Sequence, residues 1–394
     1  MQKKVIALAV AALASSAAFA QTNVTIYGVM DVGQAFVKSS GAANGGANQS
    51  TVGRLDNNAS HIGFKGVEDL GNGLKAIFQY ESNVAGDTAG AMAGGRDTFV
   101  GLTGGFGTVV AGTLTHPLRA MGAKVELMPG AIGVGTTMSV TGRLNGNNTG
   151  ADDRARNAIA YVSPSFGGFS GTVAYINGET QPNSSAAAAA VTTGDLGGYQ
   201  ICNGAVIAAS ATCSGTSAVN AAEARSYQIA GQYDNGPLFV GAGYHRADNI
   251  GGNADVDARI YRVAAVYSLP TNTKLTALFD NTKVEGSNGA YDKRNAWSIG
   301  AAQSFGKNTV GLEYGRSGKI KTQDGTEADT KSSIWSALYT YTLSKRTSVH
   351  ARYSKLTNQD GINNNFYVNP VSNGVTTGNG SDYTGYMVGL RHAF

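Results

Sequence analysis

The sequence predicts an all-β protein, a sixteen-stranded antiparallel transmembrane β-barrel with short periplasmic turns and long extracellular loops. The first observation is composition, because 55 glycines and 18 tyrosines with only 7 prolines in 394 residues are typical of many short strands and turns. The second is a repeated unit of about ten residues in which apolar and polar side chains alternate. The third is a regular alternation of short and long connections, which an even-stranded barrel explains and a soluble sandwich does not require.

The amino-terminal residues predict export. Two lysines precede an apolar run over 5–13, and residues 18–20, Ala-Phe-Ala, have the small-x-small form that signal peptidase cuts. We therefore expect a signal peptide over 1–20 and a mature barrel over 21–394. Loss of the two lysines lowers the formal net charge from +4 to +2. A charge so nearly balanced indicates no nucleic-acid partner.

Strands rather than helices are expected to cross the membrane. After the signal peptide the longest run of small apolar residues covers only 186–191, far short of the roughly 18 residues that a membrane helix needs. Sixteen strands are predicted, to within several residues at each end, near 24–37, 58–68, 74–83, 96–103, 108–113, 156–163, 169–176, 225–233, 238–246, 257–268, 273–283, 294–305, 309–318, 332–343, 347–358 and 382–394.

Seven of the connections are tight turns, and eight are longer and rich in Gly, Asn, Asp and Ser. The third long loop, over 114–153, is too long for a mere connection, and we expect it to be functional.

The alternation within a strand predicts which face meets lipid. In 74–81, Leu, Ala, Phe and Tyr occupy one face, and Lys75, Gln79 and Glu81 occupy the other. A bilayer places hydrocarbon outside a barrel and water inside it, so the polar face is expected to point into the lumen. The last strand has Tyr386, Val388 and Leu390 on one face and ends the chain on Phe394, an aromatic of the kind that lies at membrane interfaces.

The remaining chemistry in the sequence is sparse. Cys202 and Cys213 are expected either to pair in a loop disulfide, because the chain enters an oxidising compartment, or to stay as free thiols. The five histidines show no metal-ligand spacing, and no Gly-x-Ser-x-Gly or phosphate-binding glycine loop is present. We therefore predict no metal, no cofactor and no enzymatic activity.

Several motifs together resemble the trimeric sixteen-stranded general porins of Gram-negative outer membranes, of the betaproteobacterial type. The matching segments are 24–28, 62–71, 99–102, 157–164, 166–169, 233–238, 343–347 and 389–392 with the terminal Phe394. The resemblance implies a homotrimer in outer-membrane lipid and lipopolysaccharide. It also implies that assembly machinery recognises the carboxyl-terminal strand, with Phe394 as part of that signal.

The resemblance further implies that loop 114–153 folds into the barrel and narrows it opposite basic residues of the wall. The family pattern is matched at Glu81, Arg96 and Arg154, whereas His61 and Thr113 stand where the pattern has arginines. The predicted pore constriction consists of Arg96, Arg154, Glu81, His61, Lys65, Arg119 and Glu126. Charges on the lipid face would cost about 2–4 kcal/mol at the midplane, so these groups are expected to face water. The alternative is that they are ordinary solvated lumen side chains.

The predicted function is a water-filled channel for passive diffusion of small hydrophilic solutes and ions, with a weak preference for anions. A substrate-specific outer-membrane channel is the alternative, and the departures at His61 and Thr113 favour it. An outer-membrane hydrolase and a structural barrel without a conducting lumen are the other classes considered. Lipid hydrolysis would indicate the hydrolase, and absence of conductance in planar bilayers would indicate the structural barrel.

Overall fold

The computed structural model describes residues 23–43, 45–88, 95–128, 130, 132–144, 147–148, 150, 152–178, 199–202, 205–208, 222–250, 254, 256–286, 289–372 and 377–394. The predicted signal peptide lies outside these residues. So do Cys213 and the side chain of Cys202, on which the candidate disulfide depends. No helix of the described residues is long and apolar enough to cross a membrane.

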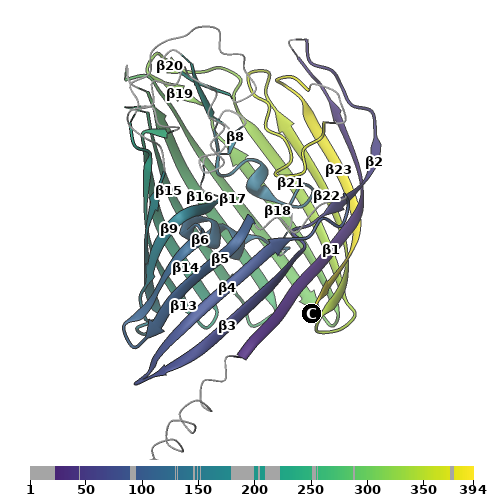
Figure 1. Cartoon of the computed structure of the whole chain (residues 1–394). Helices are drawn as coiled ribbons and strands as arrows, with labels where there is room; N and C mark the ends of the chain where they lie inside the picture. The colour runs from purple at the N-terminus through teal and green to yellow at the C-terminus, as the bar shows by residue number, and fades with distance from the viewer. Residues whose placement is uncertain are drawn as a thin grey trace, which may run out of the picture.

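Sixteen strands of one antiparallel sheet close a barrel, which confirms the predicted fold (Figure 1). Strand β1 closes it by pairing with β3 over its first residues and with β23 over the rest. The barrel strands are β1 (Asn23–Ser40), β3 (His61–Gly71), β4 (Leu74–Asn83), β5 (Gly95–Gly104), β6 (Gly107–Thr115), β9 (Arg154–Val162), β10 (Phe169–Asn177), β13 (Arg225–Asn235), β14 (Leu238–Asp248), β15 (Asp257–Ser268), β16 (Thr273–Glu285), β17 (Tyr291–Phe305), β18 (Asn308–Ser317), β21 (Ser332–Thr342), β22 (Thr347–Asn358) and β23 (Asp382–Ala393).

The short turns all lie at the end of the barrel that holds the carboxyl terminus, and the long loops lie at the other end (Figure 1). The turn between β3 and β4 shows why the sequence dictates tight turns. Gly71, Asn72 and Gly73 all adopt positive φ, at 87°, 52° and 77°, a region that glycine and asparagine enter at low cost.

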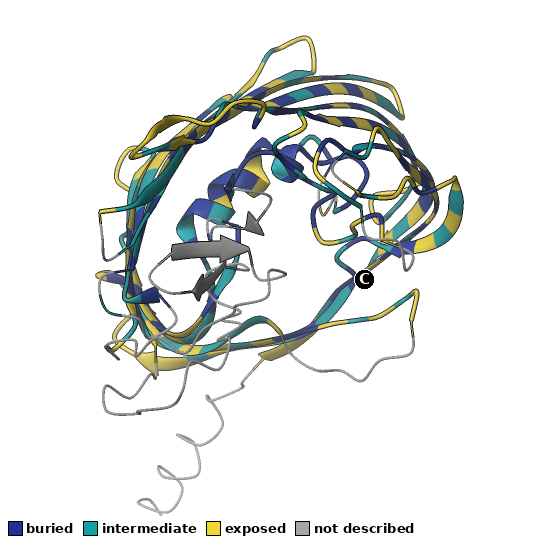
Figure 2. Cartoon of the chain, turned by 90° about the horizontal axis from the view of Figure 1, so that it is seen from above, coloured by how far each residue is buried: buried dark blue, intermediate teal, exposed yellow. Residues whose placement is uncertain are grey.

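Exposed and buried residues alternate along the barrel strands, as the sequence pattern predicts (Figure 2). Many of the exposed residues are large and apolar, and many of the buried ones are polar or charged. On β23, Val388 is 61% exposed while its neighbour Met387 is 1% exposed. On β16 the exposed Phe279 is followed by the buried carboxylate of Asp280. An apolar outer band with charged groups inside is the pattern of a barrel in lipid.

Several shorter elements were not predicted from the sequence. β2 (Val52–Asn57) pairs with the second half of β1 and is separated from β3 by a break at 58–60, where Ala59 has a φ of 54°. Within the described residues, the loops also carry three small hairpins: β7 (Arg143–Leu144) with β8 (Asn147–Asn148), β11 (Tyr199–Cys202) with β12 (Ala205–Ala208), and β19 (Lys321–Thr322) with β20 (Gly325–Thr326).

The third long loop lies inside the barrel (Figure 2). It holds helix α2 (Pro117–Val125) and the short helix η1 (Thr137–Ser139). Pro117 suits the first position of a helix because its missing N–H would have no partner there. Leu118, Met121 and Val125 recur at helical spacing and are buried.

The wall leaves room for this helix. α2 contacts β13 to β16, and η1 contacts β18 and β21. A Cβ at Gly243 of β14 would lie 2.8 Å from Cε of Met121 and 2.9 Å from Cδ1 of Leu118. Glycine at this position therefore allows the helix to approach the wall closely.

Candidate functional site: an arginine-lined passage beside the third loop

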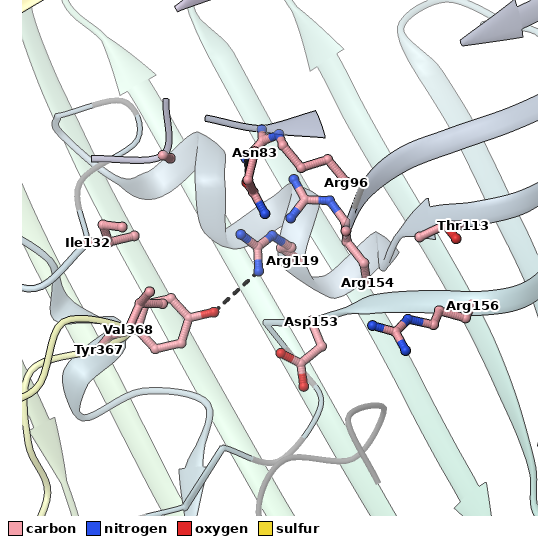
Figure 3. Close-up of a pocket in the computed structure, with 12 residues that line it drawn as sticks. Asn83, Arg96, Thr113, Arg119, Ile132, Asp153, Arg154, Arg156, Tyr367 and Val368 are labelled. Carbon is pink, nitrogen blue, oxygen red and sulfur yellow. Dashed lines mark hydrogen bonds between the residues drawn. The ribbon is translucent and has the colours of Figure 1, made fainter. Parts of the chain in front are cut away.

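Four arginines line one cavity of about 280 Å³ between the third loop and the barrel wall (Figure 3). Arg96 comes from β5, Arg154 and Arg156 come from β9, and Arg119 comes from α2 of the loop. Figure 3 shows the side chains of Arg96, Arg119 and Arg154 close together, with Arg156 to one side. The other lining residues are Ala59, Asn83, Gly95, Thr113, Ile132, Asp153, Tyr367 and Val368.

Arg96 of β5 is paired with Glu81 of β4. The Nε of Arg96 donates to Oε1 of Glu81, and the hydroxyl of Tyr27 donates to Oε2 at 3.0 Å. His61 lies on the same group, with its Nε2 at 3.8 Å from Oε2 of Glu81. The predicted residues Arg96, Glu81 and His61 are therefore brought together.

Arg154 is balanced by a carboxylate that the sequence analysis missed. Its Nε donates to Oδ1 of Asp97 at 2.9 Å, and the hydroxyl of Thr115 donates to the same oxygen at 2.7 Å. Asp97 follows Arg96 directly, so strict alternation would place the two on opposite faces. An irregularity in the pairing of β4 with β5, between Tyr80 and Ser82, lets both carboxylate pairs form side by side.

A second irregularity affects Arg154 and Arg156. Asn157 has a φ of 52°, and the register of β9 with β6 shifts between Gly112 and Leu114. Ala155 and Ala158 are consequently both buried, at 2% and 1% exposed, although an unbroken strand would separate them. Simple alternation along β9 therefore ends at Asn157.

Arg119 comes from the loop and has no carboxylate partner among the described residues. It donates to the backbone oxygen of Asp152 and, at 3.2 Å, to the hydroxyl of Tyr367. Both acceptors are neutral, and a guanidinium remains charged at any working pH. The loop therefore brings to the cavity a guanidinium without a carboxylate partner, together with the carboxylate of Asp153.

Two predicted residues lie apart from the arginines. The ammonium of Lys65 lies 5.2 Å from the ring centroid of Tyr27, whose hydroxyl donates to Glu81. Glu126 is buried at the end of α2 beside Glu313 of β18. Burial and the nearby Glu313 carboxylate raise the pKa of Glu126 well above its usual value. Among the described contacts, Glu126 touches none of the four arginines.

A buried ion network, which the sequence analysis did not foresee, fixes the loop to the opposite wall. Arg262 of β15 is fully buried and contacts Asp152 of the loop at 2.5 Å and Asp280 of β16 at 2.6 Å. Asp280 also accepts from the backbone N–H of Gly142 at 2.8 Å. Arg262 lies between the outward-facing Tyr261 and Val263, so alternation alone predicts that it faces the lumen. Its pairing with Asp152 is not predictable in this way, because Asp152 is distant in sequence.

A closed barrel with an apolar outer face, a charged lumen and a loop folded inside defines a channel protein of the outer membrane. The chain belongs to the Gram-negative porin family, which matches it over residues 7–361. It is similar to Outer membrane porin protein 32 of Delftia acidovorans, with 31% identity over 401 residues and full coverage of both chains.

Solved structures give the same result. An anion-selective porin from Comamonas acidovorans matches 95% of this chain and all of that chain, with a TM-score of 0.70 and 26% identity. OmpT of Vibrio cholerae, in a trimer form, shares the fold at 13% identity, with a TM-score of 0.60 over 95% of this chain and 99% of that chain. The protein therefore forms an outer-membrane channel for solute diffusion, as predicted.

Proposed function

We propose that this porin passes small hydrophilic solutes and ions with a weak preference for anions, set by Arg96, Arg119 and Arg154 beside the third loop. The observation that carries the proposal is the single cavity that these arginines share with Arg156. Groups that line a narrow, water-filled passage select ions by their charge. Charge is screened over roughly 8–10 Å at physiological salt, so only groups beside the narrowest part bias permeation.

The charge balance in the passage explains why the preference is weak. Four guanidinium groups stand against the carboxylates of Glu81, Asp97 and Asp153, an excess of one positive charge. His61 and Thr113 add no fixed charge at neutral pH. Zero-current potentials measured across a salt gradient test the proposal directly. A wild-type potential whose sign indicates cation selectivity would contradict it.

The protein is further proposed to act as a homotrimer. The family supports this, and so does the apolar outer face of β1, where Val24 is 55% and Ile26 is 60% exposed next to Gly28. Such a face can pack against a second copy as well as against lipid. A heat-modifiable oligomer on mild-detergent gels is expected, and a monomer under several native detergent conditions would argue against the trimer.

Export and assembly complete the proposal. Residues 1–20 act as a cleaved signal peptide, and the carboxyl-terminal strand is recognised by the assembly machinery before insertion beside lipopolysaccharide. The backbone of Phe394 exchanges hydrogen bonds with Gly28, at 3.1 Å and 3.0 Å, so the last residue lies at the seam where β23 meets β1. Mass measurement of the mature chain tests the cleavage, and a mature chain that keeps residues 1–20 would contradict it.

A further inference from the structure

An apolar alcove interrupts the polar lining of the lumen. It has a volume of about 160 Å³ and lies on the inner side of β6, β9 and β10, where β6 leads into the third loop. Its apolar lining is made by Val110, Leu114, Ala155, Ala158, Ala160 and Ala174. The lumen of a porin is normally polar, so apolar side chains on three adjacent strands need an explanation of their own.

The loop does not provide that explanation. α2 packs against β13 to β16, away from the alcove, and among the described residues of the loop those that border it are its first four, over 114–117. The four alanines are small, and they leave a space where larger side chains would fill it. An apolar cavity of about 150 Å³ is known to stay dry and to bind a benzene ring. The alcove therefore has the volume for one six-membered aromatic ring.

The polar end of the alcove presents hydrogen-bond acceptors. Nδ1 of His116 lies 2.7 Å from the carbonyl oxygen of Gly150, and a carbonyl only accepts, so Nδ1 carries the proton. Burial lowers the pKa of His116 to about 4, so the ring is neutral at pH 7 and its Nε2 keeps a lone pair. The hydroxyl of Thr115 donates to Asp97, so its oxygen can only accept a further hydrogen bond, and the Asp97 carboxylate likewise only accepts.

We propose that the alcove is a binding site for a small neutral phenol, an aromatic ring that carries one O–H donor. The ring would contact the alanines, and the hydroxyl would donate to an acceptor at the polar end. A carboxylate does not fit this end, because it would bring a further acceptor beside Asp97. Asp97 is also paired with Arg154, so an occupant would lie next to the arginine-lined passage and reduce the ion current.

The experiment uses the purified full-length porin in planar bilayers and in detergent. Phenol, anisole and benzoate are compared by block of single-channel current and by ligand-observed NMR. Phenol is expected to bind about tenfold more tightly than anisole, because methylation removes the only donor. Equal binding of phenol and anisole, or tighter binding of benzoate than of phenol, would overturn the proposal.

Variants locate the site. Ala160→Leu and Ala158→Leu each fill the alcove and are expected to abolish phenol binding while leaving the zero-current potential unchanged. Ala277→Leu, on the exposed outer face of β16, is the matched control and is expected to bind phenol as wild type does. Heat-modified gel mobility shows that each variant folds. Wild-type phenol binding by either folded alcove variant would place the ligand elsewhere and refute the assignment.

Discussion

The guanidinium of Arg262 on the barrel wall contacts the carboxylate of Asp152 in the third loop at 2.5 Å, and both side chains are buried. Asp280 completes the group from the next strand. Removal of one partner of a buried ion group leaves the other charge without compensation, which typically costs 3–5 kcal/mol. We therefore infer that the ion pairs of Arg262 with Asp152 and Asp280 are the main contacts that hold the loop against the wall. They also keep Arg119 of the loop beside the cavity.

Replacement of Arg262 tests whether these ion pairs hold the loop against the wall. Arg262→Met is expected to release the loop, because Asp152 and Asp280 would lie side by side without a cation. Single-channel conductance should become larger or fluctuate, and proteases should cleave the loop faster. Arg246→Met is the matched control, because Arg246 forms partly exposed pairs with Asp248 and Asp257, and such pairs are worth about 0–1 kcal/mol. An Arg262→Met pore with wild-type conductance and protease resistance would show that other contacts hold the loop.

The docking of the loop should also depend on pH through His116. Burial lowers the pKa of this histidine to about 4, below the 6.5 of an unfolded chain. The unfolded state therefore binds a proton first as pH falls, so stability is lost between about pH 6.5 and pH 4, by up to about 3 kcal/mol. Protease cleavage of the loop should accelerate across this interval, and His116→Gln should reduce that acceleration. The remainder is expected from His245, whose buried ring lies 5.3 Å from that of His116, between centroids. A cleavage rate that does not change between pH 6.5 and pH 4 would contradict the prediction.

Deletion of Phe394 is expected to reduce the amount of porin in the outer membrane. The ring covers Gly28, since a Cβ there would lie 2.5 Å from Cζ of Phe394, but Phe394 is still 44% exposed. Its burial therefore contributes less than the about 1.5–3 kcal/mol of a fully buried aromatic side chain. The proposed assembly signal predicts a larger loss than this burial alone explains. Phe394→Tyr keeps an aromatic end and is expected to assemble normally. Normal outer-membrane levels of the truncated porin would remove the idea of an assembly signal.

The barrel was predictable from sequence because each strand carries its own alternation and each turn its own glycine or asparagine. Leu74 to Glu81 illustrates this, since the lipid and lumen faces are already separated there. The third loop was predictable in position but not in structure. The loop is held by the ion pair between Asp152 and Arg262, and no local pattern indicates a contact between residues so far apart in the chain.

The candidate site was predictable only in part, for a related reason. Arg96, Arg154 and Glu81 were identified from the resemblance. In the structure Arg96 forms an ion pair with Glu81, and Arg154 forms one with Asp97. Asp97 was missed because an irregularity in β5 moves it out of strict alternation. Glu126 was expected beside the arginines, whereas the helix turns it toward Glu313. The irregularities and the direction of the helix follow from packing across the barrel, not from local sequence.

The zero-current potential across a potassium chloride gradient tests most directly whether the arginines beside the third loop set the ion preference. Arg96→Gln and Arg154→Gln should each shift this potential toward cations at low salt and less at molar salt, because salt screens the charges. Glu81→Gln removes a negative charge from the same site, because this carboxylate balances Arg96. It should therefore shift the potential toward anions. Shifts of opposite sign at low salt are the predicted result. Unchanged potentials in both arginine variants would show that these arginines do not set the ion preference and would place the selective part of the pore elsewhere.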